Sequence, residues 1–299
     1  MDVGIVGGGL SGMFAARLLS DLGHNVTVWD KGSRIGGRLT GWKTDDGSKI
    51  HLGARALDSI PRWMDRFVDE WERLGLVNRE GDALIPKAPF PELLEHLSEG
   101  SSICLNNRVS GLELMEGGVS VTTESEGERE SSRYDRVIVA IPVEQAAEIA
   151  SDLDIEFDGE SIPSIVAWGF CDSIPEEVPE GFRIYDLDNS TTMVELSAEM
   201  SGQLIDLDKS SLSKIITDSM GISDEGWRSH KWRYSRAASG PGSVMAKDGV
   251  SFIGDAFGHE IGSAGAALDS AARAVSDLHL SKLEAEFERW PVQSYLSDW

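Results

Sequence analysis

The chain has 299 residues, 40% of them hydrophobic, which is enough to bury a large core in one domain or in two closely packed ones. Its 51 acidic and 27 basic side chains leave a net charge of −24, which repels nucleic acid and anionic membranes, so neither is expected as a partner. No apolar run approaches the roughly 20 residues of a membrane helix and no basic leader precedes the first strand, so a soluble, cytoplasmic protein is expected.

The excess of acidic side chains has two possible explanations. Salt screens the repulsion between like charges, so such a surface would suit a high-salt cytoplasm, and it would equally serve to keep the protein soluble with no environmental meaning.

Cys104 and Cys171 show no disulfide framework and no metal-ligand spacing, and the six histidines form no HExxH pair. A reduced interior is therefore expected, with no metal site.

The N-terminal elements form the first half of a βαβ unit. Residues 2–6 predict a buried parallel strand, residues 13–22 carry apolar side chains at helical spacing, and "VTVWD" (26–30) predicts the next strand. A glycine-rich turn joins the first strand to the helix.

Further elements follow without repeats or a long linker. In chain order they are helices at 61–75 and 90–100, a hairpin that breaks at 117–118, a buried strand at 136–142, strands of a second sheet at 164–172, 182–187 and 192–198, a helix at 210–221, a last strand at 250–257 and an alanine-rich helix at 264–279.

The turn "GGGLSG" (7–12) matches the G-x-G-x-x-G fingerprint of dinucleotide-binding proteins. Gly7 permits the tight turn, Gly9 lets the backbone approach a pyrophosphate, and Gly12 lets the helix pack close to the strand. The free N–H groups at the start of the helix supply an anion site. Asp30 ends the second strand, where a carboxylate accepts hydrogen bonds from ribose hydroxyls. These features predict a dinucleotide and leave both NAD and FAD open.

Two further stretches favour FAD. In "DKGSRIGGR" (30–38), Gly36 and Gly37 let the main chain pass close to the cofactor, and Arg38 offers a fork of donors to a pyrophosphate. More than 200 residues downstream, a strand runs into Gly254 and Asp255, where an acid can bind the ribityl chain that NAD lacks. The helix that begins near residue 263 can direct its N-terminus at the negative charge of a reduced flavin ring.

These motifs resemble the FAD-dependent amine oxidase superfamily, and within it the renalase-like branch. The stretches that carry the resemblance are "GIVGGGLSG", "DKGSRIGGRL", "HLGAR" (51–55), "YDRVIVAIP" (134–142), "HKWRYS" (230–235) and "GDAF…AGAALDSA" (254–271), in the expected order. The resemblance implies an α/β fold with a Rossmann-type FAD-binding domain and a discontinuous α+β substrate domain, as in amine oxidases and p-hydroxybenzoate hydroxylase. The FAD-binding domain would comprise residues 1–57, 99–150 and 242–299, and the substrate domain residues 58–98 and 151–241.

Carried over motif by motif, the resemblance also implies a set of FAD-binding residues. They are Gly7, Gly9, Leu10, Ser11 and Gly12 at the pyrophosphate, Asp30 and Lys31 at the adenosine ribose, Gly37 and Arg38 beside the diphosphate and ribityl chain, Gly53, Ala54 and Arg55 along the flavin, Val109 at the adenine, Gly254 and Asp255 at the ribityl hydroxyls, and Gly262, Ser263 and Ala264 at the pyrimidine edge of the ring.

Three details adjust this picture. Asp30 stands where glutamate is commoner, which shortens its reach without changing its chemistry. Arg55 stands where renalase-like chains often carry glutamine. Neither cysteine lies in a cofactor-contacting stretch, so the FAD is expected to be bound non-covalently.

No catalytic residue is assigned, because hydride transfer to a flavin needs no obligatory acid or base. The candidates for the substrate pocket are Arg55, Trp232 and Tyr234. The two aromatic residues alternate on one strand, so they are expected to face the same way and to hold a planar ring. Arg55 is expected to bind an anionic group. Core packing of the aromatic rings and a surface ion pair of the arginine are the alternatives.

The resemblance implies an FAD-dependent oxidoreductase that takes a hydride from a reduced, or isomeric, nicotinamide dinucleotide and yields hydrogen peroxide. Its partners would be this small-molecule electron donor and molecular oxygen, and the protein would be a monomer or a weak dimer. Two alternatives stay open. One is an amine oxidase or desaturase that acts on another donor, and the other is a non-catalytic redox sensor that binds FAD.

Overall fold

A six-stranded sheet organises one half of the computed structural model, which describes residues 1–43, 47, 49–171, 177–187 and 191–280. The strand order is β16-β17-β11-β1-β2-β7, and every pairing is parallel except that of β16 with β17. The strands are β1 (Asp2–Val6), β2 (Asn25–Trp29), β7 (Ser102–Cys104), β11 (Arg136–Val139), β16 (Met245–Lys247) and β17 (Val250–Phe252). This is the Rossmann-type sheet that the sequence predicts.

Both faces of this sheet are covered, as the apolar strands predict. Val3 and Ile5 of β1 face one core, which contains the helices α1 (Leu10–Asp21), α3 (Phe90–Leu97) and α7 (Ala264–Leu280). Val6, Val137 and Val139 face a second core, which contains α4 (Val143–Ser151) and an antiparallel sheet. That sheet consists of β8 (Arg108–Met115), β9 (Gly118–Ser125) and β10 (Glu128–Tyr134).

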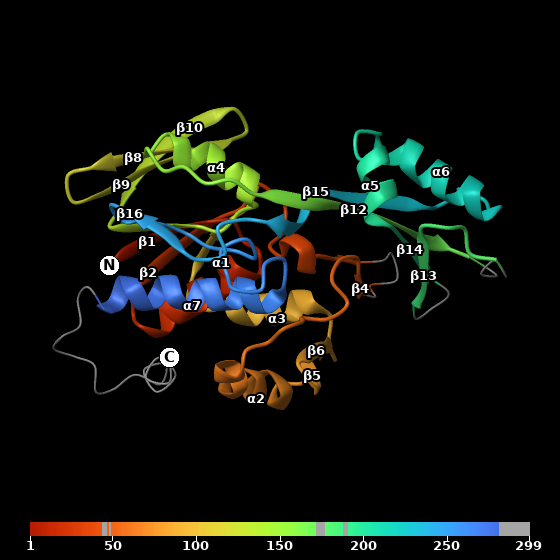
Figure 1. The fold of residues 1–299 in the computed structure, drawn as a ribbon, viewed down its shortest axis with the longest axis horizontal. Helices are drawn as coiled ribbons and strands as arrows, with labels where there is room; N and C mark the ends of the chain where they lie inside the picture. The colour runs from red at the N-terminus through yellow and green to blue at the C-terminus, as the bar shows by residue number, and fades with distance from the viewer. Residues whose placement is uncertain (44–46, 48, 172–176, 188–190, 281–299) are drawn as a thin grey trace.

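A second, four-stranded antiparallel sheet lies beside the first half of the molecule, at the right of Figure 1. Its order is β13-β14-β12-β15, with β12 (Glu160–Phe170), β13 (Phe182–Leu187), β14 (Thr191–Leu196) and β15 (Arg228–Ser239). The helices α5 (Ala198–Leu204) and α6 (Lys209–Met220) cover one face. The other face carries Val166, Trp168 and Met193, which pack against Ile50 and Leu52 from the first half of the chain.

The pairing of β12 with β15 is irregular at one point. Ile162 pairs with Arg236 and Ser164 with Trp232, so residues 233–235 of β15 are opposed by a single residue of β12. A bulge of this kind interrupts the alternation of side chains between the two faces of a sheet.

Residues 58–98 share the core of the first sheet. They contain α2 (Asp65–Arg73), β5 (Val77–Glu80) and β6 (Ala83–Pro86) besides α3. Trp71 and Phe90 are fully buried in the same core as Val3 and Ile5. This packing groups residues 58–98 with the cofactor side of the molecule, whereas the sequence assigns them to the substrate domain. The domain boundaries remain a prediction.

The predicted strand at 250–257 is shorter than expected, because β17 ends at Phe252. Gly254 has a φ of +137°, which turns the chain out of the sheet. No helix in the described ranges is long and apolar enough to cross a membrane.

Candidate active site

The glycine turn after β1 has two glycines that the fold needs and one that it does not. A Cβ atom on Gly7 would lie 2.4 Å from the carbonyl oxygen of Ala140, and one on Gly12 would lie 2.0 Å from the carbonyl oxygen of Gly7. A Cβ atom on Gly9 would meet nothing within 4 Å. The missing side chain of Gly9 therefore leaves open space at the carboxyl end of the sheet, where such folds bind a dinucleotide.

Two further loops lie against this turn. The Gly36 N–H donates to the carbonyl oxygen of Gly8 at 2.8 Å, and the Cβ position of Gly37 is 3.5 Å from the Cα of Gly9. The carbonyl oxygen of Arg38 accepts a 3.0 Å hydrogen bond from the Ala54 N–H, and a Cβ atom on Gly53 would lie 1.7 Å from the same oxygen. The structure thus brings together three stretches that the sequence assigns to the cofactor, residues 7–12, 36–38 and 53–55.

Asp30 is fixed at the adenosine end of the expected site. Its carboxylate accepts hydrogen bonds from the Gly8 N–H at 2.8 Å and the Gly32 N–H at 2.7 Å. Each carboxylate oxygen keeps a lone pair for a ribose hydroxyl. The Asn107 N–H donates to the Asp30 carbonyl oxygen at 3.0 Å, which holds the stretch that leads to the buried Val109 beside this acid. Lys31 is exposed next to it.

Asp255 follows β17 and connects it to β15. Its Oδ2 accepts a 2.8 Å hydrogen bond from the Ala237 N–H. Burial raises the pKa of the Asp255 carboxyl, and this hydrogen bond opposes the rise. The Gly262 N–H donates to the Asp255 carbonyl oxygen at 2.9 Å, so this acid also anchors the loop that leads to α7.

The first N–H groups of α7 already have partners. The Ala264 N–H donates to Oδ1 of Asp58 at 2.8 Å, and the Gly265 N–H donates to the Asp58 carbonyl oxygen at 3.0 Å. The Ala266 N–H donates to Oγ of Ser263 at 2.9 Å. Asp58 therefore stands at the helix N-terminus that the sequence directs at a flavin ring, and it supplies the negative charge there itself.

Arg38 joins the two halves of the molecule. Its Nη2 atom lies 3.2 Å from Oε1 of Glu195 in β14, and its guanidinium lies over the Trp232 ring, 5.2 Å from the centroid. The Trp232 Nε1–H donates to the Gly37 carbonyl oxygen at 3.2 Å, and the His230 ring lies 4.4 Å from that of Trp232. These contacts place Trp232 at the cofactor loops, and the same side chain also packs against the core that contains Val166, Trp168 and Met193.

Arg55 belongs to the same cluster. Its guanidinium lies over the ring of Tyr185, 4.3 Å from the centroid, and its Nη2–H donates to the Met193 sulfur at 3.2 Å. The Tyr185 hydroxyl donates to Oε2 of Glu195 at 3.1 Å. We call the five residues Arg38, Arg55, Tyr185, Glu195 and Trp232 the arginine cluster.

The arginine cluster carries positive charge that the described residues do not fully satisfy. Burial lowers the pKa of both Arg38 and Arg55, but a guanidinium stays charged at neutral pH. The Nε atoms of both arginines are buried, and neither has a hydrogen-bond partner among the described residues. A water molecule or an anionic group can satisfy buried donors of this kind.

Of the aromatic pair predicted for the substrate pocket, Trp232 has described contacts to the cofactor loops, and the place of Tyr234 in the pocket stays a prediction. The bulge at residues 233–235 separates Trp232 from Tyr234. Among the described residues, no ring contact or hydrogen bond joins Tyr234 to the arginine cluster. The sequence reasoning missed Glu195 and Tyr185, and the one available signal was an acid inside the apolar strand "TTMVEL".

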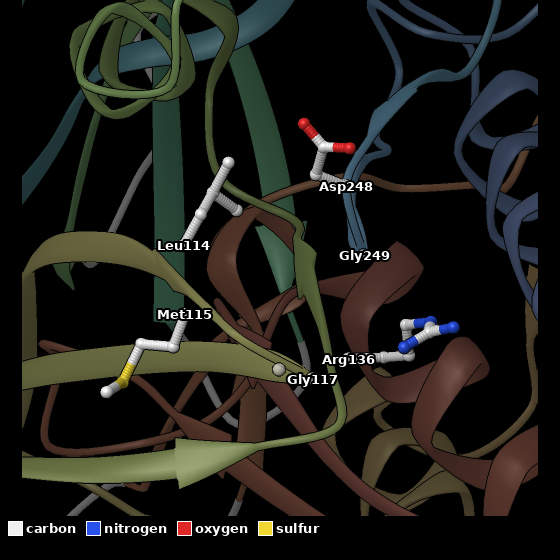
Figure 2. Close-up of a pocket in the computed structure, with 7 residues that line it drawn as sticks. Leu114, Met115, Gly117, Arg136, Asp248 and Gly249 are labelled. Atoms are coloured by element: carbon white, nitrogen blue, oxygen red, sulfur yellow. The ribbon is translucent and has the colours of Figure 1, made fainter.

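A depression of about 480 Å³ lies away from the glycine turn. Figure 2 shows residues that line it. Leu114, Met115, Arg136 and Asp248 contribute to its lining. Arg136 begins β11 and Asp248 precedes β17, so this depression lies at the amino ends of the parallel strands, whereas Rossmann-type folds bind their ligands at the carboxyl ends. It is not the cofactor site.

The fold and the site define a Rossmann-type dinucleotide-binding protein with a second, antiparallel sheet over the site. Residues 5–71 match the NAD(P)-binding Rossmann-like domain, and residues 65–164 match the flavin containing amine oxidoreductase family. The two matches overlap at residues 65–71 and together span residues 5–164, so this part of the chain is similar to flavin-containing amine oxidoreductases, which supports FAD as the cofactor.

Relatives agree with these matches over a short region. An L-amino-acid oxidase of Siganus canaliculatus is 45% identical over 63 residues, which are 20% of this chain and 12% of that protein. A zeta-carotene desaturase of Synechocystis sp. is 45% identical over 53 residues, which are 18% of this chain and 11% of that protein. The chain thus matches only about a tenth of the length of either relative.

Likeness in structure extends over the whole fold. The crystal structure of a putative protoporphyrinogen oxidase from Exiguobacterium sp. 255-15 superposes with a TM-score of 0.66. The superposition covers 94% of this chain and 99% of that one, at 12% sequence identity. At 12% sequence identity, this structural similarity shows that the two proteins share a fold and shows nothing about function.

The residues present fit an FAD molecule. Gly9 leaves open space at the turn where a pyrophosphate is expected, and Arg38 keeps an unsatisfied buried donor beside it. Asp30 and Asp255 supply carboxylates at the ends of two different parallel strands, as the two ends of a long dinucleotide require.

Proposed function

We propose that the protein is an FAD-dependent oxidoreductase of the renalase-like type, which oxidises a reduced nicotinamide dinucleotide or one of its isomers. Bound FAD supplies the acceptor of a hydride, and molecular oxygen is the proposed final acceptor, which gives hydrogen peroxide. The observation that carries the proposal is the arginine cluster, which lies against the loops that fit FAD and offers positive charge beside flat aromatic rings.

The residues of the cluster have distinct parts in this proposal. Arg55 binds an acidic group of the donor, because its guanidinium keeps an unsatisfied N–H. A planar group of the donor would pack beside the Arg38–Trp232 and Arg55–Tyr185 stacks. The second sheet contacts the cofactor loops through Glu195 and Trp232 and would limit the access of water to the reacting atoms.

Charge supports an acidic donor over an amine. Arg38 lies beside the expected pyrophosphate, so Arg55 is the cationic side chain of the cluster that is left to a donor, and it repels an ammonium group and attracts an anion. This matters in a chain whose overall charge is −24, because the general field opposes an anionic donor and only local charge can favour one. A desaturase acting on an uncharged donor is the second candidate, since a desaturase is among the relatives of the glycine-turn region.

The oligomeric state and the cellular location are also part of the proposal, and both rest on the sequence alone. We propose a cytoplasmic monomer or weak dimer with a small-molecule donor as its partner. Sedimentation of the purified protein tests the assembly directly.

Anaerobic stopped-flow absorbance of the yellow protein tests the function. The protein is mixed with reduced nicotinamide dinucleotides, with their isomers and with a panel of amines. Rapid loss of flavin absorbance with one dinucleotide and not with amines is the expected result. Reduction by an amine would move the protein to the amine oxidases proper, and no reduction by any donor would leave an FAD-binding protein without this activity.

A matched pair of variants ties the reaction to the cluster. Arg55→Gln is expected to raise the donor concentration needed for half-maximal reduction, about tenfold or more, because a charge-assisted contact is lost. Arg66→Gln, at an exposed position of α2, is the control and is expected to behave as the wild type.

A further inference from the structure

We propose that Arg34 and Arg228, whose guanidinium groups both lie over Trp42, form a second anion-binding site beside the arginine cluster. Its ligand is a phosphate group of the proposed dinucleotide donor, so the inference rests on the proposed function for the identity of that ligand. The site itself rests on contacts that do not depend on the proposed function, and its test needs no turnover.

Trp42 brings the two arginines together. Trp42 belongs to β3 (Gly41–Lys43), Arg34 lies in the loop after β2, and Arg228 begins β15. The Cζ atom of Arg34 lies 5.4 Å from the centroid of the Trp42 ring, and that of Arg228 lies 4.9 Å from it. The half-buried Trp42 ring also lies against the ring of the buried Trp168, with 5.5 Å between the centroids, which holds the indole in place.

Both arginines are exposed, and neither pairs with a carboxylate among the described residues. The Nη1–H of Arg34 donates to the Gly41 carbonyl oxygen at 3.2 Å, and the Arg228 side chain forms no hydrogen bond within the described residues. Two guanidinium groups over one ring repel each other, and the chain has 51 acidic side chains from which a counter-charge could come. Their arrangement without a carboxylate favours a site for an anionic ligand over a structural ion pair.

The strand register places this site close to Arg55. Arg228 pairs with Trp168 in β12, and Trp168 pairs with Met193 in β14. The Met193 sulfur accepts the 3.2 Å hydrogen bond from Arg55. Because neighbouring strands are about 4.8 Å apart, about 10 Å separates the Cα atoms of Arg228 and Met193. A diphosphate carries acidic oxygens on both phosphorus atoms, so Arg55 can bind one phosphate and Arg34 with Arg228 the other.

Glu195 does not neutralise the two arginines of this site. It lies further along β14, where it binds Arg38 and pairs in register with Arg183 of β13. Arg34 and Arg228 therefore both keep their positive charge, which favours a phosphate group over a singly charged carboxylate. The planar fork of a guanidinium also matches the spacing of phosphate oxygens.

The test is a calorimetric titration of the FAD-loaded protein with ADP, AMP and adenosine. In the proposed arrangement bound FAD occupies the glycine turn and Arg38, so the binding of added ADP reports a different site. The three probes share the base and the ribose and differ in the charge of the phosphate. The wild type is expected to bind ADP most tightly and adenosine least.

Arg34→Gln and Arg228→Gln are each expected to weaken ADP binding about tenfold and to leave adenosine binding unchanged. Arg228→Lys keeps the charge without the fork and is expected to recover part of the loss. Arg66→Gln, at an exposed position of α2, removes the same charge elsewhere on the surface. This control is expected to bind ADP as the wild type does.

The inference is overturned if the wild type binds ADP no more tightly than adenosine, if both glutamine variants keep the wild-type affinity for ADP, or if Arg66→Gln loses as much affinity as they do. Failure of the proposed function gives a different result. ADP would still bind through both arginines, whereas no nicotinamide dinucleotide would reduce the flavin.

Discussion

At the scale of single residues, the glycine turn contains one glycine that the fold requires, Gly12, and one that only a ligand would require, Gly9. Gly12 has no room for a side chain because the carbonyl oxygen of Gly7 lies against it. Gly9 has room, and its φ of −80° and ψ of −173° suit any residue. If a pyrophosphate occupies the open space beside Gly9, the two glycines should respond differently to the same substitution.

We predict that Gly9→Ala leaves the stability of the FAD-free protein within about 0.5 kcal/mol of the wild type and weakens FAD binding strongly. Gly12→Ala is expected to destabilise the FAD-free protein by about 1–3 kcal/mol or more, because its methyl group meets rigid backbone. Urea unfolding of the FAD-free proteins and fluorescence titration with FAD measure the two effects. Equal FAD affinity in Gly9→Ala and the wild type would contradict the assignment of the turn.

Two half-buried histidines predict how stability depends on pH. Burial lowers the pKa of both His51 and His230 to about 4, with Arg55 acting in the same direction on His51 and Lys209 on His230. The unfolded chain binds protons at these side chains near pH 6.5, whereas the folded chain does not until about pH 4. Their contribution is therefore full above about pH 6.5 and is lost as the pH falls toward about 4.

The double variant His51→Leu, His230→Leu is expected to lose less stability than the wild type between these two pH limits. Urea midpoints measured at several pH values check this difference. The carboxylates of the two proteins titrate alike, so the comparison isolates the histidines. His259→Leu, at an exposed loop position, is the control and should follow the wild type. Identical slopes for the double variant and the wild type would contradict the burial argument.

Local sequence predicts the residues of the site that lie within one motif. Gly7, Gly9, Gly12 and Asp30 lie within or directly after a single βαβ unit, where spacing predicts their relative positions, and Arg38 lies in the glycine-rich stretch that follows it. The partner of Arg38 could not be found in this way, because 157 residues separate it from Glu195. Only the packing of the second sheet on the first brings that carboxylate to the cofactor loops.

At the scale of elements, α7 depends on a residue from a distant loop. Asp58 binds its first two N–H groups through one side-chain and one backbone oxygen. A Cβ atom on Gly265 would lie 1.8 Å from the carbonyl oxygen of Ser59, so the loop and the helix are in direct contact. The sequence predicts α7 from its alanine-rich pattern, but the capping residue precedes the helix by about 200 positions and leaves no local signal.

Asp58→Ala is expected to lower the free energy of unfolding by about 1 kcal/mol, the usual cost of losing an N-terminal cap. Asp58→Asn should recover most of this loss, because an amide oxygen can accept the same hydrogen bond. Chemical denaturation measures both variants, with Asp218→Ala at an exposed position of α6 as the control. A wild-type stability for Asp58→Ala would show that the contact adds nothing to the helix.

The strand β15 shows where a pattern of alternation fails. Trp232 and Tyr234 are two positions apart, which in a regular strand puts both on one face. A bulge lies at residues 233–235, and Trp232 is the one of the two with described contacts to the cofactor loops. A bulge depends on how the neighbouring strand pairs, which a single strand pattern does not contain.

At the scale of the whole molecule, the two sheets meet at the site. The order of elements predicts the Rossmann-type sheet and a second sheet, and the structure contains both. The grouping of residues 58–98 is harder to predict, because their amphipathic helices could cover either sheet and only tertiary packing decides between them. The local positive charge of the arginine cluster likewise cannot be predicted from the amino-acid composition, because the composition is strongly acidic overall.

The central claim is that this chain holds FAD, and the most direct test is to identify the cofactor that the purified protein releases. The protein is unfolded by heat, and the released small molecule is identified by mass and quantified against the chain. One FAD for each chain is expected, free in solution because no covalent bond retains it. Release of NAD, or the failure of the FAD-free protein to bind added FAD, would contradict the assignment of FAD.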